Sequence, residues 1–486
     1  MHLRARLAPL FLIAACGGSD DLPGPALDGF VRQDVTSTVD LHLVPFDANA
    51  EDLLGPDDHN AMYGKLPEIV SSVRTNGLDV ALTSYADPAK PRAFVLRYDG
   101  TDARTLTAAY EVPTLGRLLG FVSAPDGGFY YATGSNDDTV TPEYPAKGVH
   151  RANVVRVYRA DAAGKITFDV DLDVARAMVD PEAAPLIHPG VASSARLALA
   201  GNQLALVHGI NTAYDPNVMA RHQMAMSTYL DATTGAITRT AGIWVSHSFD
   251  QRYLADGDDL YELHLGDAYP REVVVSRIRG GAAADGVSLY HPKGATGDNN
   301  TYTRLGGIAR TSGGYLAVFA TEHGDVTGER VNSARDLALV RTVADFASGD
   351  PAAALDPSFG TTFDVTSAGA TVTNRVAWLT GYDAVDASTH AERPKLVPVD
   401  GGFVVLWERW TMGAAQTFDG TFALRLDATG AVVAPATRVS DSHLPRGDDA
   451  FADRGQACWL TGAAATGVVT EHCVSSALAL SETALP

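Results

Sequence analysis

The histidines are the residues of this sequence whose spacing best suits chemistry. His208 in LALVHG and His264 in LYELHLG lie six residues after equivalent turn positions, and Glu408 occupies the corresponding place in a third copy of the pattern. Neutral imidazole and carboxylate groups are ligands that zinc accepts. These three residues form a candidate metal site, although no short-range spacing such as H-E-x-x-H occurs. Histidines bonded to the nearby backbone are the alternative interpretation.

Other polar residues near the ends of expected strands extend this candidate site. A hydrolytic or metal-dependent enzyme would gather such groups at the mouth of a channel. The candidates for ligand binding or catalysis are His208, His222, His247, Asp250, Arg252, His264, His323 and Glu408. No nucleophile-elbow motif such as G-x-S-x-G occurs in a strand-to-helix context. A binding function without catalysis is therefore favoured, and an enzyme is the alternative.

The hexapeptide HSFDQR, residues 247–252, places a base, a carboxylate and a guanidinium on one expected strand. Successive side chains of a strand point to opposite faces, so His247 and Asp250 do not form a local pair. Asp250 and Arg252 share a face. We expect these two residues to form a structural ion pair or a hydrogen-bond network between neighbouring units.

Aspartate-rich turns suggest calcium as a second metal candidate. They occur at residues 135–139, 256–260, 297–300 and 446–453. Calcium takes about six to eight oxygen ligands, but no D-x-D-x-D-G loop with a distal glutamate is present. Solvated turns are the expected role of these stretches.

Aromatic residues in or near turns make a glycan a candidate ligand, beside a protein partner, because sugars stack on aromatic rings. The residues concerned are Tyr130, Tyr131, Tyr144, Tyr269, Tyr290, Tyr302, Trp407 and Trp410. Packing between strands is the expected role of most of them.

Repeated β-hairpins are the elements that would position these residues. In the stretch 246–271, short apolar runs enter and leave a Gly257-Asp258 turn, which is the pattern of a partly buried hairpin. The same shape recurs with turns at Gly77, Gly127-Gly128, Gly201-Asn202, Gly313-Gly314, Gly401-Gly402 and Gly455-Gln456. Most copies are about fifty to sixty residues apart, the length of a four-stranded propeller blade. The sequence predicts an all-β, seven-bladed propeller, with six or eight blades as alternatives and short helices only in insertions.

A second hairpin follows several of the first. An aspartate precedes the turn glycine by three or four residues at Gly164, Gly235 and Gly430, with a looser copy at Gly100. These hairpins resemble the outer strands of quinoprotein-like bacterial propeller repeats. The tryptophan-docking pattern of true quinoproteins is missing, so the resemblance implies no quinone cofactor.

The charge balance bears on the partners. The chain has 58 acidic and 37 basic residues and a net charge of −21, which argues against a nucleic-acid partner. Residues 30–486 are expected to form one propeller domain, because each blade packs only on its neighbours. We expect a monomer.

The N-terminus predicts export. Arg4 and Arg6 precede a short apolar run that is followed by Leu12-Ile13-Ala14-Ala15-Cys16, which resembles the bacterial lipobox. The resemblance implies a signal peptide at residues 1–15, lipidation of Cys16, a flexible tether at 16–29 and a membrane anchor. Gly17, where an aspartate would retain the protein at the inner membrane, favours the outer membrane of a Gram-negative cell envelope, facing the periplasm or the surface. A plain signal peptide with Cys16 unmodified or discarded is the alternative.

The two remaining cysteines are expected in the last blade. Cys458 and Cys473 flank two expected strands joined by a Gly/Ala turn, so a disulfide would form across them in an oxidising compartment. Metal binding by the two thiols with His472 is the alternative. Residues 36–45 are expected to pair into this last blade and close the ring.

Overall fold

The computed structural model describes residues 31–33, 66–84, 92–100, 103–135, 155–172, 194–215, 220–243, 250–266, 272–279, 282–294, 303–323, 334–346, 351–383, 388–463 and 468–485. These residues are almost entirely β-strand, and their one helix is the single turn α2 (Pro351–Ala354). The all-β prediction is confirmed. The predicted signal peptide and tether lie outside the described residues.

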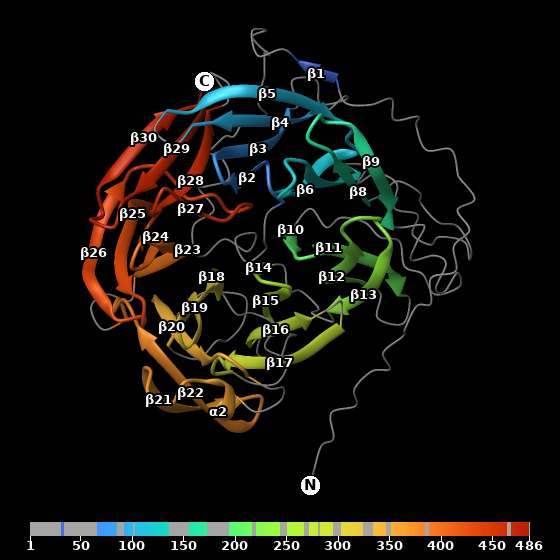
Figure 1. The fold of residues 1–486 in the computed structure, drawn as a ribbon. Coiled ribbons are helices and arrows are strands. Elements are labelled where there is room, and N and C mark those ends of the chain that lie inside the picture. Colours follow the sequence, from blue (N-terminus) through green and yellow to red (C-terminus); the bar gives the residue numbers. More distant parts are fainter. Residues whose placement is uncertain are drawn as a thin grey trace.

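The sheets stand around a central axis as the blades of a β-propeller (Figure 1). Each blade begins with its innermost strand and runs outward. Three of the blades are β2 (Ile69–Arg74), β3 (Gly77–Ser84), β4 (Arg92–Asp99) and β5 (Thr105–Val112); β6 (Gly116–Ser123), β7 (Phe129–Ser135), β8 (Val155–Ala160) and β9 (Ile166–Asp171); and β10 (Ala195–Ala200), β11 (Gln203–Asp215), β12 (Ala220–Asp231) and β13 (Ile237–Ile243). The short strand β1 (Val31–Gln33) pairs with the outer edge of the first of these blades.

Two further blades stand alone, and the other strands form one larger sheet. The separate blades are β14 (Gln251–Asp256), β15 (Asp259–Leu265), β16 (Val273–Arg279) and β17 (Ala282–Tyr290); and β27 (Phe451–Asp453), β28 (Gln456–Ala463), β29 (Val468–Val474) and β30 (Leu480–Ala484). The larger sheet contains β18 (Arg304–Arg310), β19 (Gly314–Glu322), β20 (Arg335–Val343), β21 (Thr361–Ser367), β22 (Ala370–Trp378), β23 (Thr389–Val399), β24 (Gly402–Met412), β25 (Gln416–Asp427) and β26 (Val432–Ser440).

The described strands therefore form five separate blades and not the predicted seven, together with one nine-stranded sheet. The two parts of the large sheet are joined by one parallel residue pair, Arg335 of β20 with His390 of β23. Hairpin spacing predicts local strand pairs, but it cannot predict hydrogen bonding between neighbouring units. Because of this pairing, two units that the repeat pattern predicts as separate blades form one sheet.

All of the predicted turns are confirmed. The inner turns join β2 to β3, β6 to β7, β10 to β11, β14 to β15, β18 to β19, β23 to β24 and β27 to β28. The outer turns at Gly100, Gly164, Gly235 and Gly430 join the last two strands of their blades. Gly201 shows why glycine is required: its φ is 53°, and a Cβ there would lie 2.2 Å from Oδ1 of Asp258.

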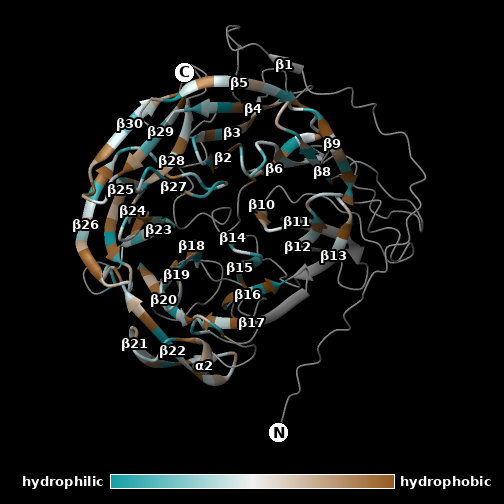
Figure 2. Ribbon diagram, viewed as in Figure 1, coloured by the Kyte–Doolittle hydropathy of each residue, from teal (hydrophilic) through white to brown (hydrophobic). Residues whose placement is uncertain are grey.

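The hydrophobic core lies between neighbouring sheets, and brown and teal segments alternate along the strands around the ring (Figure 2). The innermost strands contact one another in the order β2, β6, β10, β14, β18, β23, β27 and back to β2. Leu78 and Val80 of β3 share one core cluster with Leu460 of β28 and Val469 of β29. The first and last blades are thus held together by apolar packing, which closes the ring.

The predicted disulfide between Cys458 and Cys473 is confirmed. The two cysteines are directly opposite in the β28–β29 pair, with Cα atoms 4.1 Å apart. The chain-entropy model gives a stabilisation of about 3 kcal/mol for closing a loop of this size. The predicted strand at residues 36–45 lies outside the described residues, and the four described strands of this blade all come from residues 451–484.

Candidate functional site at the axis of the ring

The connection between β26 and β27 reaches the inner strands of several blades. We call residues 447–449, Gly-Asp-Asp, the axial segment. The carbonyl oxygen of Gly447 accepts a hydrogen bond of 2.7 Å from Nη1 of Arg196 on β10. Oδ2 of Asp448 accepts bonds from the backbone N–H (3.2 Å) and the hydroxyl (3.1 Å) of Ser71 on β2. The carbonyl oxygen of Asp448 accepts a bond of 2.6 Å from Nζ of Lys395 on β23.

Three cations converge on the carboxylate of Asp449. Nε of Arg196 lies 3.0 Å from Oδ2, Nε of Arg252 lies 2.8 Å from Oδ1, and Nζ of Lys395 lies 4.0 Å from Oδ1. The fold explains this convergence, because each cation pairs with the fifth residue of the next strand. The pairs are Arg196 with Val207, Arg252 with Leu263 and Lys395 with Leu406. Equivalent positions on three innermost strands thus direct positive charge to the axis.

The charges of this cluster depend on one another. Burial alone would raise the pKa of Asp449, but Arg196, Arg252 and Lys395 hold it well below its usual range. Burial lowers the pKa of Lys395, and the Arg252 charge lowers it further. Burial and the neighbouring Asp449 charge raise the pKa of Asp448. Asp449 is therefore the permanent counter-charge of the arginines.

A cavity of about 140 Å³ lies beside the axial segment. Its walls come from the inner strands β2, β6 and β10 and from the start of β27. The lining residues are Val70, Ser71, Gly120, Phe121, Ala195, Arg196, Leu197, Gly447, Asp448, Asp449, Ala450 and Phe451. Gly447 fits here because a Cβ would lie 2.6 Å from the carbonyl oxygen of Leu66. The arrangement is an open site beside a charged cluster, and it can bind a small group.

The ion pair predicted between Asp250 and Arg252 is confirmed. Nη1 of Arg252 donates to Oδ1 of Asp250, and Nη2 donates to the carbonyl oxygen of Leu305 on β18 at 3.3 Å. Because Arg252 also contacts Asp449, it links its own blade to the next inner strand and to the axial segment.

His208 and His264 occupy the same height in neighbouring blades, as predicted, since both are the sixth residue of their strands. Both are buried and bond to the nearby backbone, which was the alternative interpretation. Nδ1 of His208 lies 3.0 Å from the carbonyl oxygen of Gly209. Nδ1 of His264 lies 3.2 Å from that of Leu265, and burial lowers the pKa of His264 to about 4.

Glu408 does not share the position of these histidines. It is the seventh residue of β24, so its side chain points to the opposite face of the strand from the sixth residue. The carboxylate is fully buried and accepts bonds from Nη1 of Arg393 (2.9 Å), Nε1 of Trp410 (2.8 Å) and the N–H of Leu444 (2.7 Å). Nδ1 of His443 lies 3.2 Å away. Burial would raise the pKa of Glu408, but Arg393 and His443 hold it below its usual value.

His323 forms a second histidine–carboxylate pair. Its Nε2 lies 3.0 Å from Oδ2 of Asp336, and its ring stacks on Trp378 with centroids 3.7 Å apart. Asp336 also accepts bonds from the hydroxyl of Thr380 (2.5 Å) and the N–H of Tyr382 (2.7 Å). Burial would raise the pKa of Asp336, but these bonds lower it. This arrangement fixes an imidazole that remains partly exposed.

The other predicted site residues divide into two groups. His247 and Cys16 lie outside the described residues, and His222 lies on β12 with its side chain outside them.

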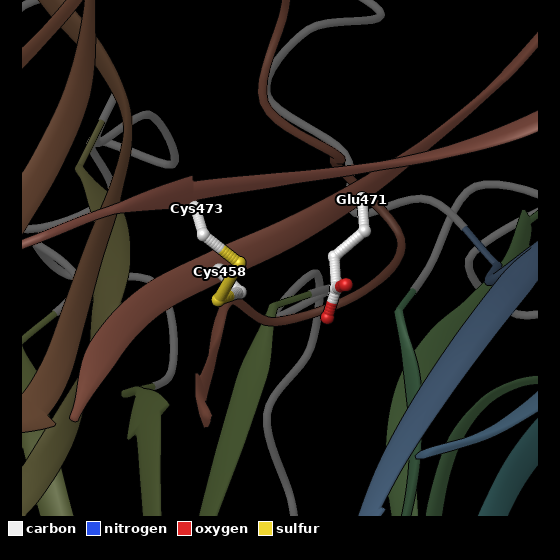
Figure 3. A group of neighbouring side chains, drawn as sticks. All are labelled: Cys458, Glu471 and Cys473. Atoms are coloured by element: carbon white, nitrogen blue, oxygen red, sulfur yellow. A yellow bond between two sulfur atoms is a disulfide. The ribbon is translucent and has the colours of Figure 1, made fainter. Parts of the chain in front are cut away.

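Within the described residues, the one group of three His, Cys, Asp or Glu side chains close enough to share an ion is Cys458, Glu471 and Cys473. Figure 3 shows the two sulfur atoms bonded to each other beside Glu471. A disulfide offers no thiolate to a metal, so this group is structural.

The aromatic residues proposed for a glycan site are packing residues where the structure describes them. Tyr130, Tyr131, Tyr290, Trp407 and Trp410 are all buried. Tyr144, Tyr269 and Tyr302 lie outside the described residues.

Sequence reasoning missed the axial segment, since residues 446–453 were expected to form a solvated turn. Asp448 is instead buried, and Asp449 carries the central ion pairs. One signal was available: Arg196 and Arg252 each stand five residues before a turn glycine, Gly201 or Gly257. Cations at equal spacing on inner strands imply an acidic partner at the axis.

None of the described segments contains a helix with the length and hydropathy that a membrane crossing requires.

No protein-family model and no curated protein matches the sequence. Several solved structures are similar to this chain. An acylaminoacyl peptidase of Pyrococcus horikoshii is 11% identical over 86% of this chain and 52% of its own, with a TM-score of 0.41. A puromycin-hydrolyzing peptidase of Mycobacterium tuberculosis is 12% identical over 87% and 56%, with a TM-score of 0.42. An alpha-L-arabinofuranosidase from Lactobacillus brevis is 9% identical over 64% and 91%, with a TM-score of 0.31. The chain spans about half the length of the two peptidases.

Proposed function

We propose that this protein is a cell-envelope lipoprotein whose propeller binds a small ligand at the axis of the ring, without catalysis. The observation that carries the proposal is the cavity beside the axial segment, where three inner strands and charged groups meet. A site of this kind needs a rigid frame, and the ion pairs of Asp449 supply it by tying inner strands of different blades together. A protein or glycan partner on the rim is compatible with this site.

We also propose that the ring contains seven structural units in one domain. Seven inner hairpins are present, and their first strands contact one another in a closed order. The nine-stranded sheet divides naturally at the single residue pair between β20 and β23. On this division, β18 to β22 form one unit and β23 to β26 form the next.

Filling the cavity should abolish ligand binding. Ala450 lines the cavity and is half-buried, so Ala450→Leu places three more carbon atoms in it. Three four-carbon probes, butylammonium, butyrate and 1-butanol, are titrated into the full chain by calorimetry. We expect at least one of them to bind the wild-type protein and to bind the variant at least tenfold more weakly.

The control for this experiment is Ala428→Leu, an equal enlargement in the exposed turn between β25 and β26. It should leave every affinity unchanged. Equal binding of all probes to wild type and Ala450→Leu contradicts a site at the axis.

A hydrolase is the second candidate function, because Asp336 holds the partly exposed His323. Turnover of p-nitrophenyl butyrate that is lost in His323→Ala supports this candidate.

The proposed location in the cell envelope can be tested at Cys16. We propose that Cys16 is lipidated and anchors the protein in the outer membrane, as its resemblance to the lipobox implies. In a Gram-negative host, the wild-type protein should enter the detergent phase of a temperature-induced phase separation, and Cys16→Ser should stay in the aqueous phase. Ser19→Ala in the same tether is the control and should partition like wild type. Identical partition of wild type and Cys16→Ser means that the protein has no lipid on this residue.

A further inference from the structure

Three side chains on neighbouring strands of the last blade form a hydroxyl–imidazole–carboxylate arrangement, which we call the last-blade triad. They are Thr461 of β28, His472 of β29 and Glu482 of β30 (Figure 1). Oγ1 of Thr461 lies 2.8 Å from Nε2 of His472, and Nδ1 of the same ring lies 2.9 Å from Oε1 of Glu482. None of the three lines the axial cavity, so the triad is a separate feature of the ring.

Strand pairing sets the geometry of the triad. His472 is directly opposite Trp459 of β28 on one side and Glu482 of β30 on the other. Because alternate side chains of a strand share a face, Thr461 and Trp459 lie on the same face of β28, and the hydroxyl of Thr461 reaches the imidazole diagonally. The ring of His472 stacks on that of Trp459, with centroids 5.0 Å apart and planes 9° apart. The imidazole is thus held in one orientation.

The two ring nitrogens of His472 have different roles, and the carboxylate decides them. An ionised carboxylate only accepts hydrogen bonds, so Nδ1 carries the proton that is donated to Glu482. In the neutral ring, Nε2 then has a lone pair and accepts the hydrogen bond from the hydroxyl of Thr461. Burial lowers the pKa of His472, although Glu482 offsets part of this effect, and a lowered pKa favours the neutral ring. Thr461 therefore faces a base that can take its proton.

We infer that Thr461 is a nucleophile that accepts an acyl group from small activated esters, with His472 as its general base and Glu482 as the residue that positions the imidazole. A hydroxyl bonded to an oriented imidazole is activated for such an attack. Thr461 is partly exposed, so a small ester can reach it. The bond between Oγ1 and the acyl carbon forms, and the ester C–O bond breaks. The proton of the hydroxyl passes to Nε2 and from there to the departing alkoxide.

Acetylation of the full chain by p-nitrophenyl acetate tests the inference. The tryptic peptide 455–486 contains no lysine, so acetylation within it is not the common modification of lysine. The peptide contains Thr470, which lies directly opposite Thr461 and is the internal control. None of the described residues accepts a hydrogen bond from the hydroxyl of Thr470. Mass spectrometry of the peptide should find Thr461 at least about tenfold more acetylated than Thr470.

Two variants test the other members of the triad. His472→Gln removes the base, and the ratio of acetylation at Thr461 to that at Thr470 should fall at least about tenfold. Glu482→Gln alters a side chain that is 50% exposed and should lower this ratio at least about threefold, because an amide no longer fixes the proton on Nδ1.

The ratio separates activation of one hydroxyl from a general loosening of the blade, which would expose both threonines. If His472→Gln does not fold, the exposed position of Glu482 keeps the test decisive. Equal acetylation of Thr461 and Thr470 in the wild-type protein overturns the inference, and so does a ratio that Glu482→Gln leaves unchanged.

Discussion

Asp449→Asn should destabilise the folded ring by about 2–3 kcal/mol. Removing one partner of a fully buried ion pair costs about 3–5 kcal/mol, because the other charge is left in a medium of low polarity. The side chain of Asp449 is 37% exposed, so water reduces this cost. Arg196 loses its carboxylate partner, whereas Arg252 keeps Asp250. The midpoint of urea unfolding measures the change in stability.

The matched control is Asp345→Asn on the surface. Asp345 pairs with Arg277 at 3.0 Å but is 94% exposed, and ion pairs of this kind contribute little to stability. The two variants remove the same charge and differ in position. Equal shifts in their urea midpoints would mean that the axial cluster is not a special contributor to stability.

Glu262→Gln should raise the free energy of unfolding more at pH 8.5 than at pH 4.5. The difference between the two pH values should be about 3–5 kcal/mol. Glu262 lies on β15, is 1% exposed, and accepts bonds from the hydroxyl of Ser227 at 3.1 and 3.3 Å. Burial raises its pKa to about 8, and hydrogen bonds from Ser227, Tyr229 and Tyr253 offset only part of this effect. Glutamine keeps the shape of the side chain and has no proton to lose.

The sign follows from proton linkage. In the unfolded chain this carboxyl titrates near its ordinary pKa of about 4.3, so between that pH and about 8 the folded protein binds one more proton than the unfolded chain. The wild-type protein therefore loses stability as pH rises through this window. Each pKa unit corresponds to about 1.4 kcal/mol, which sets the size of the effect.

Thermal unfolding of wild type and Glu262→Gln at several pH values measures this difference. The Tm of the variant should exceed that of wild type at pH 8.5, and the two curves should converge toward pH 4.5. Asp345→Asn serves as the control, since it removes a carboxylate from the surface. A constant difference between wild type and Glu262→Gln at every pH would show that Glu262 titrates normally in the folded protein.

The sequence predicted the local structure well because β-hairpins are encoded locally. Glycine turns such as Gly257-Asp258, flanked by short apolar runs, require only neighbouring residues to form. The Cys458–Cys473 disulfide was predictable for the same reason, since both cysteines belong to one hairpin. Contacts between hairpins are a different matter. The pairing of β20 with β23 depends on how two blades approach each other, and no spacing in the sequence predicts it.

The candidate site was predicted less well for the same physical reason. The histidine pattern gave the correct height of His208 and His264, but a strand buried on both faces can satisfy an imidazole through its own backbone. The axial segment makes its bonds over large sequence distances, such as 377 residues from Asp448 to Ser71. The Asp250–Arg252 pair was predictable because it is local.

The axial segment also sets an order for folding. Arg196 and Arg252 belong to blades that are synthesised long before residues 447–449 emerge, and these blades must pass through a stage in which their inner strands carry positive charge without Asp449. At that stage Arg252 still has Asp250, whereas Arg196 lacks the carboxylate of Asp449 and is costly to bury at the axis. The axial segment supplies this carboxylate when the last blade joins the first. We therefore expect closure of the ring and pairing of Arg196 to form one late, cooperative step.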